Sequence, residues 1–136
     1  MIGRARARRD ERKEQKILDS IDVIMLQVRR ELGKKVEPGT IDLVTVELHI
    51  RSLCTLTAAL VAQTLEYGAD KGDAHLWRRK SKEHVKAVLE VTHGGKNEAF
   101  ICVIIEMAVA EAFYFQTALK PDDIKLGTHL EEYLSE

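Results

Sequence analysis

The fold is decided by the stretch EAFICVIIEMAVAEAFYFQTAL, residues 98–119, in which 17 of the 22 residues are apolar. The stretch is too long for an ordinary β-strand and is preceded by Asn97, a good helix-capping residue, so it predicts a helix. Phe113, Tyr114 and Phe115 then point in three directions about 100° apart, and no single neighbouring helix can cover all of them. We therefore expect this helix to lie centrally in a helical fold or to lend one side to a partner.

Three further stretches have the apolar spacing of amphipathic helices. In the first of them, expected at 10–32, Ile17, Ile21 and Ile24 recur at intervals of four and three residues. The other two stretches each follow a polar residue that can cap a helix. They predict helices at 41–67 and 74–92.

Residues 44–51 leave a second reading open, because Val44, Val46, Leu48 and Ile50 alternate with polar residues as they would in a β-strand. No second stretch alternates as regularly, and a lone strand cannot pair its backbone groups. We therefore favour one continuous helix here, with a strand as the alternative.

The predicted fold class is all-α: a compact bundle of four main helices followed by a short C-terminal helix. Thr128 and Glu131 have the spacing of a capping box, which places the short helix at about 129–135. At 136 residues, the chain can bury one sizeable core but is short for two ordinary domains. We expect a basic N-terminal arm at 1–9 and a single helical-bundle domain at 10–136, with main helices at 10–32, 41–67, 74–92 and 98–119.

The net charge of −1 argues against a protein that coats nucleic acid or a membrane by charge alone. The charge is nevertheless uneven, since residues 1–96 hold 19 Lys and Arg against 14 Asp and Glu, whereas residues 97–136 hold 2 against 8. Two groups of cations in the basic part support an alternative function, nucleic-acid binding, although no helix-turn-helix or zinc-finger pattern follows. Its residues would be Arg4, Arg6, Arg8, Arg9, Arg12, Lys13, Arg78, Arg79, Lys80, Lys82 and Lys86.

Arg79 and His84 stand with four residues between them in the third predicted helix. The spacing resembles the Arg-(four to six residues)-His motif of HEPN-domain ribonucleases, which are also small, helical and usually dimeric. Lys80 departs from that motif, because the family commonly has a polar Asn, Asp or His there. The resemblance implies a ribonuclease in which His84 assists proton transfer and Arg79 stabilises phosphate charge, and it gives a second alternative function.

Cofactor and metal chemistry has little support in the sequence. Cys54 and Cys102 form no CxxC pair, and each lies in an apolar stretch where a reduced thiol behaves as a small hydrophobe. Glu90 and His93 form one ExxH, whereas ferritin-like di-iron bundles use two. We expect no metal, no cofactor, no membrane-spanning helix and a cytoplasmic location.

The surplus of apolar surface supports the leading hypothesis, a non-enzymatic protein-binding protein that acts as a homodimer or within a complex. Regulators, inhibitors and adaptors all fit this description. Nothing in the sequence identifies the partner. The expected interface lies on the apolar stretch and comprises Phe100, Ile104, Phe113, Tyr114 and Phe115.

Overall fold

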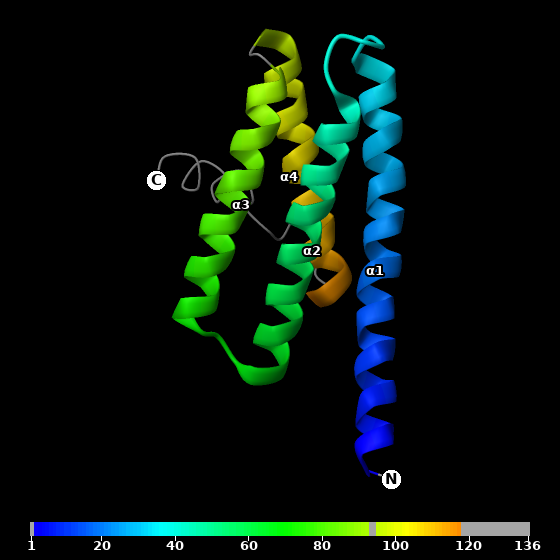
Figure 1. Cartoon of the computed structure of the whole chain (residues 1–136), viewed down its shortest axis with the longest axis vertical. Coiled ribbons are helices and arrows are strands. Elements are labelled where there is room, and N and C mark those ends of the chain that lie inside the picture. The colour runs from blue at the N-terminus through cyan, green and yellow to red at the C-terminus, as the bar shows by residue number, and fades with distance from the viewer. Residues whose placement is uncertain (1, 93–94, 118–136) are drawn as a thin grey trace.

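The computed structural model describes residues 2–92 and 95–117, with side chains described for 11–12, 14–92 and 95–116. These residues form four α-helices: α1 (Ile2–Lys35), α2 (Leu43–Tyr67), α3 (Lys71–Thr92) and α4 (Gly95–Thr117). Each helix runs antiparallel to the one before it (Figure 1). The predicted all-α bundle of four main helices is confirmed, and the short helix predicted at 129–135 lies outside the described residues.

The central helix of the bundle is α2, because it packs against α1, α3 and α4. Figure 1 shows α1 and α3 on opposite sides of α2, with α4 behind it. This position explains why α2 is long and apolar enough, by length and composition, to pass for a membrane span. Seven of its residues are buried in the bundle, so the core uses part of its apolar surface.

The alternating segment at 44–51 is helical throughout, as favoured from the sequence. Val46 and Ile50 are fully buried, whereas Val44 and Leu48 are 68% and 60% exposed. Residues four apart lie on the same side of a helix. The apparent strand pattern therefore consists of two apolar rows, one facing the core and one facing solvent.

All four helices contribute to one hydrophobic core. The largest fully buried side chains are aliphatic, and each such burial stabilises the fold by roughly 1.5–3 kcal/mol relative to exposure. They are Ile21, Ile24, Val28 and Leu32 from α1, Val46 and Ile50 from α2, Val85 and Val88 from α3, and Ile101 and Ile105 from α4.

α1 is longer than the sequence predicted, since it begins at Ile2 and not at residue 10, and ends at Lys35 and not at residue 32. The expected arm at 1–9 is thus helical from residue 2 onward, because the Ala and Arg residues there are strong helix formers. Gly33, which follows the predicted end at residue 32, lies within the helix, and a positive φ of 82° occurs later, at Gly39. The N-terminal part of α1 extends past the ends of the other helices (Figure 1).

Side-chain caps set the starts of the next two helices. Asp42 accepts a hydrogen bond from the backbone N–H of Thr45 at 3.1 Å, so α2 begins at residue 43, two residues later than predicted. Asp70 accepts one from the backbone N–H of Asp73 at 3.1 Å, so α3 begins at residue 71, three residues earlier than predicted. Gly68, with a φ of 90°, follows the last residue of α2, which ends at Tyr67 as predicted.

Candidate functional site

The five residues of the expected interface are divided between the core and the surface. Ile104 is 2% exposed and belongs to the core, so it has no free surface for a partner. Phe100 and Phe113 are partly buried against the same core. The most exposed members of the expected interface are therefore Tyr114 and Phe115, at 37% and 46%.

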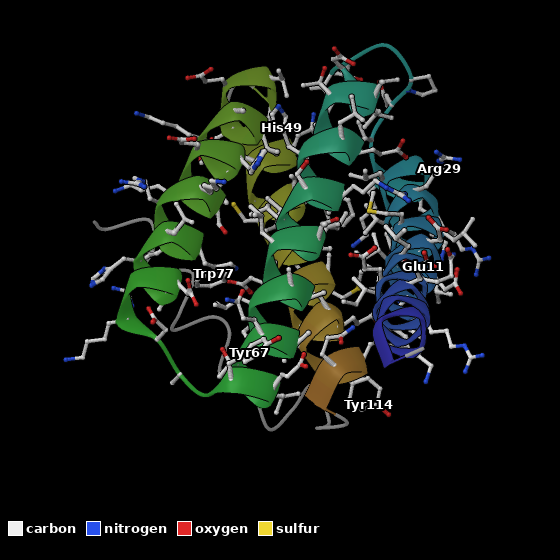
Figure 2. The ribbon with its side chains drawn as sticks, turned by 60° about the horizontal axis from the view of Figure 1, so that its bottom comes forward. Glu11, Arg29, His49, Tyr67, Trp77 and Tyr114 are labelled. Atoms are coloured by element: carbon white, nitrogen blue, oxygen red, sulfur yellow. The ribbon has the colours of Figure 1, made fainter. Side chains whose placement is uncertain are left out.

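Tyr114 and Phe115 lie near the end of α4, with their ring centroids 5.8 Å apart. Leu65 and Tyr67 near the end of α2 are also exposed, by 64% and 78%. Figure 2 shows Tyr67 and Tyr114 at the same end of the bundle. We call these four residues the apolar end.

The two groups of cations proposed for nucleic-acid binding do not form one surface. The first group lies on the N-terminal half of α1 and the second on α3, and these helices lie on opposite sides of α2 (Figure 1). In the first group, Arg12 is exposed. The other five members are not among the residues whose side chains the structure describes: Arg4, Arg6, Arg8, Arg9 and Lys13. On α3, Arg78, Arg79, Lys80 and Lys86 are exposed and Lys82 is half-buried.

The side chains of Arg79 and His84 point in different directions, although both residues lie on α3. Five residues of helix place two side chains about 140° apart. Arg79 is exposed, whereas His84 is half-buried and faces His49 of α2. The geometry of one chain therefore does not assemble the Arg–His pair that the ribonuclease alternative needs.

His49 and His84 form a direct contact between α2 and α3, with their Nδ1 atoms 2.9 Å apart. Figure 2 shows His49 directed from α2 toward α3. The ring centroids are 5.1 Å apart and the planes are tilted by 51°, so the two nitrogens point at one another. At this distance one Nδ1 carries a proton and donates it, and the other accepts.

Burial lowers the pKa of His84, and the nearby His49 lowers it further, while Glu83 opposes the shift. The pair does not make a metal site in this arrangement, because the two nitrogens face each other along one line and leave no common point for an ion. In the described part of the chain, no group of three or more His, Cys, Asp or Glu side chains could hold a metal.

A groove runs between α2 and α3 and consists of two adjoining hollows. The first, of about 130 Å³, is lined mainly by apolar side chains: Leu56, Ala59, Leu60, Gln63, Asp73, Leu76, Trp77 and Lys80. The second, of about 360 Å³, is lined by Arg51, Ser52, Thr55, Leu56, Lys80 and His84. We call the two together the α2–α3 groove, since Leu56 and Lys80 line both.

The two hollows differ in chemistry. In the apolar hollow, Trp77 points from α3 toward α2 (Figure 2), and its Nε1–H donates to the Thr57 hydroxyl at 3.1 Å. Asp73, at the far edge, accepts a hydrogen bond from the Gln63 side chain. The second hollow has two cations and an imidazole and no acidic lining residue. We call it the cationic hollow.

The two thiols lack the features of a nucleophile. Burial raises the pKa of Cys54 to about 12, and the negative charge of Glu111 adds to the effect. Burial also raises the pKa of Cys102. Both thiols are therefore protonated at neutral pH and behave as apolar packing groups.

Lys80 and His84 could be identified as candidates from the sequence, but the groove in which they meet Arg51 could not. A signal was present, because Trp77, Lys80 and His84 are spaced by three and four residues and share one side of a helix. His49 and Leu56 are seven residues apart and likewise share a side of α2. The pattern alone does not indicate that these two sides face each other.

We compared the chain with family models, curated proteins and solved structures, and nothing matched.

Proposed function

We propose that this protein is a non-enzymatic protein-binding module, a regulator, inhibitor or adaptor, whose α2–α3 groove binds an acidic amphipathic segment of a partner protein. The observation that supports it is the composition of the groove. Apolar side chains, among them Leu60, Leu76 and Trp77, line one hollow, and Arg51, Lys80 and His84 line the next. An amphipathic helix binds such a groove through apolar residues at helical spacing.

Charge complementarity favours an acidic segment over a basic one. Lys80 lies in the middle of the groove and forms no ion pair with any residue whose side chain is described. Arg79 and Lys86 add exposed positive charge on the same helix. Acidic residues of a partner are attracted to this side of the bundle, whereas basic ones are repelled. We also propose that the complex forms in the cytoplasm, in keeping with the reduced state expected from the sequence for Cys54 and Cys102.

A photo-crosslinking amino acid at position 76 tests the proposal, because Leu76 lines the groove and is 41% exposed. The same amino acid at position 26 is the matched control, since Leu26 is a 62%-exposed leucine on α1. We expect position 76 to capture a partner whose crosslinked peptide has apolar residues at helical spacing and acidic residues between them. A basic peptide, or equal capture from position 26, contradicts the proposal.

The purified partner then allows a quantitative test. Lys80→Glu reverses the central charge of the groove, and we expect it to weaken binding at least about tenfold, with a smaller effect at high salt. Arg30→Glu reverses an exposed charge on α1 and is the control. Equal weakening by both variants indicates general electrostatics and argues against the groove. Crosslinks from position 76 to a second copy of this chain also contradict the proposal, because they identify the occupant of the groove as the protein itself.

Nucleic-acid binding is the second candidate, supported by the exposed cations of α3. Arg79, Lys80, Lys82 and Lys86 form no ion pair among the side chains that the structure describes. Retention on DNA or RNA that falls steeply with salt supports this candidate, and no retention at low salt excludes it. The ribonuclease alternative is excluded if the wild-type protein cleaves RNA and His84→Ala cleaves it equally well.

A further inference from the structure

The cationic hollow brings together side chains from two helices. Arg51 comes from α2, and Lys80 and His84 come from α3. Its volume of about 360 Å³ leaves room for a small anion and for the chain that carries it. No acidic side chain lines it, although Asp22 pairs with Arg51 and Glu83 acts on His84.

The two cations have hydrogen-bond donors to spare. Arg51 binds Asp22 of α1 through Nη2, and a guanidinium has five N–H donors. The Lys80 ammonium has three donors and no ion pair with any described side chain. An anion in the hollow can therefore receive charge-assisted hydrogen bonds from both α2 and α3.

The two hydroxyls that line the hollow do not add donors. Ser52 donates to the carbonyl of Leu48 at 3.1 Å, and Thr55 donates to the carbonyl of Arg51 at 2.9 Å. Each hydroxyl has one proton, which the helix backbone already uses. Binding of an anion therefore rests on Arg51, Lys80 and His84.

The contact with His49 determines what His84 can offer. If His49 donates its Nδ1 proton to His84, then neutral His84 carries its own proton on Nε2, where it can donate to an anion. If His84 is instead doubly protonated, it donates Nδ1–H to His49 and Nε2–H to the anion. A neutral His84 that donates Nδ1–H to His49 has only an acceptor at Nε2, so an anion selects the first two arrangements, in which Nε2–H is a donor.

We propose that the cationic hollow is a binding site for a phosphate group, held by Arg51, Lys80 and the Nε2–H of His84. A carboxylate is satisfied by one guanidinium in a bidentate pair, whereas a phosphate dianion has three terminal oxygens that match three donors from two helices. The phosphate comes either from free phosphate or from a phosphoserine of the partner segment. Only the phosphoserine source depends on the proposed function, because it requires the partner segment.

Binding is linked to proton uptake. Burial lowers the pKa of His84 in the free protein, whereas an adjacent dianion favours the charged imidazolium and raises that pKa again. Affinity for a dianion therefore increases as the pH falls. The charged and titratable groups around His84 are His49 and Arg51 of α2, Lys80 and Glu83 of α3, and Asp22 of α1, which holds Arg51.

NMR of the imidazole Cε1–H groups of the full chain tests the site. The probes are inorganic phosphate, N-acetyl-phosphoserine amide and N-acetyl-glutamate amide, each at constant ionic strength. We expect both phosphates to shift the His84 signal saturably, with a dissociation constant on the order of 1 mM, and the glutamate to bind at least about tenfold more weakly. Phosphoserine binding much tighter than inorganic phosphate identifies a side chain as the source, and the reverse identifies free phosphate.

Matched variants separate the site from general electrostatics. Lys80→Met removes a cation from the hollow, whereas Lys86→Met removes one from the same helix outside it. We expect Lys80→Met to weaken phosphate binding at least about tenfold and Lys86→Met to weaken it less than about twofold. Equal losses, no saturable shift, or glutamate binding as tight as phosphate overturns the proposal. None of these results depends on a partner, so failure here is distinct from failure of the proposed function.

Sulfate tests the proton linkage, because it remains a dianion across the neutral pH range. We expect its affinity to rise severalfold from about pH 8 to about pH 6. His84→Gln retains an N–H donor but cannot titrate, so it should bind sulfate with little pH dependence. An unchanged pH dependence of sulfate binding in His84→Gln, shown by circular dichroism to be folded, overturns the role of His84. Loss of sulfate binding in Lys80→Met tests the hollow independently of His84.

Discussion

Trp77 of α3 donates a hydrogen bond from its indole Nε1 to the hydroxyl oxygen of Thr57 in α2, at 3.1 Å. Thr57 is fully buried and donates its own proton to the carbonyl of Leu53 at 2.7 Å. The chain of two bonds anchors the largest side chain of the groove to the central helix. It therefore connects the stability of the bundle to the shape of the proposed binding site.

Thr57→Val should destabilise the fold. Valine has nearly the same shape as threonine but cannot accept the indole proton, and loss of a partner to a buried polar group costs about 1–3 kcal/mol. Chemical denaturation in urea measures the change in free energy of unfolding. Thr55→Val is the control, because Thr55 is exposed and its hydroxyl donates to the backbone carbonyl of Arg51. This variant should change the free energy of unfolding by less than about 0.5 kcal/mol. Similar losses in both variants would contradict the anchoring role.

The apolar stretch of α4 provides a second matched pair. Ile105 is 1% exposed, and Ile105→Ala should reduce the free energy of unfolding by about 2–5 kcal/mol through lost burial and a cavity. Val103 is 61% exposed on the same helix, so Val103→Ala should cost less than about 0.5 kcal/mol. Thermal and urea melts of the two variants measure the difference. A large loss at Val103 would show that another chain covers this side of α4.

The four main helices could be predicted from apolar spacing because each contributes a row of residues to the core. Their starts were less accurate, since capping depends on which of several nearby polar residues turns toward the backbone. Asp42 and Asp70 do so here. The end of α1 was misplaced because Gly33 permits a left-handed turn but does not require one.

The candidate site could be predicted only in part. Ile104 was expected at an interface because the sequence shows that α4 is apolar on several sides, but not how much of it the other helices cover. The side of α4 that carries Ile104 and Ala108 is covered by the bundle itself. His49 and Arg51 were not assigned to a site, because their meeting with α3 depends on how the two helices pack.

Dimer formation remains a prediction from the sequence, and the apolar end now gives it a specific test. We expect sedimentation velocity to show a homodimer and Phe115→Ser to shift it toward the monomer, because loss of an aromatic contact at an interface commonly weakens association at least about tenfold. Val103→Ser is the control, since it removes an exposed apolar side chain from the middle of α4. A wild-type monomer at all concentrations rules out the dimer, and equal weakening by both variants argues against the apolar end as its interface.

The contact between His49 and His84 should make the fold less stable in acid. The pKa of His84 is lowered from 6.5 in the folded chain, so the unfolded chain binds a proton near pH 6.5 that the folded chain does not yet bind. The free energy of unfolding therefore decreases as the pH falls below about 6.5, until the folded-state pKa is reached.

Thermal melts from about pH 8 to about pH 5 measure this effect. His84→Gln removes the titrating group, and we expect its melting temperature to depend less on pH than that of the wild type. His75→Gln is the control, because His75 is an exposed histidine on the same helix, and it should retain the wild-type dependence. A phosphate in the cationic hollow should oppose the acid effect, because it favours protonated His84. Added sulfate should therefore raise the melting temperature more at low pH than at high pH, and a uniform rise at all pH values would separate sulfate binding from the histidine pair.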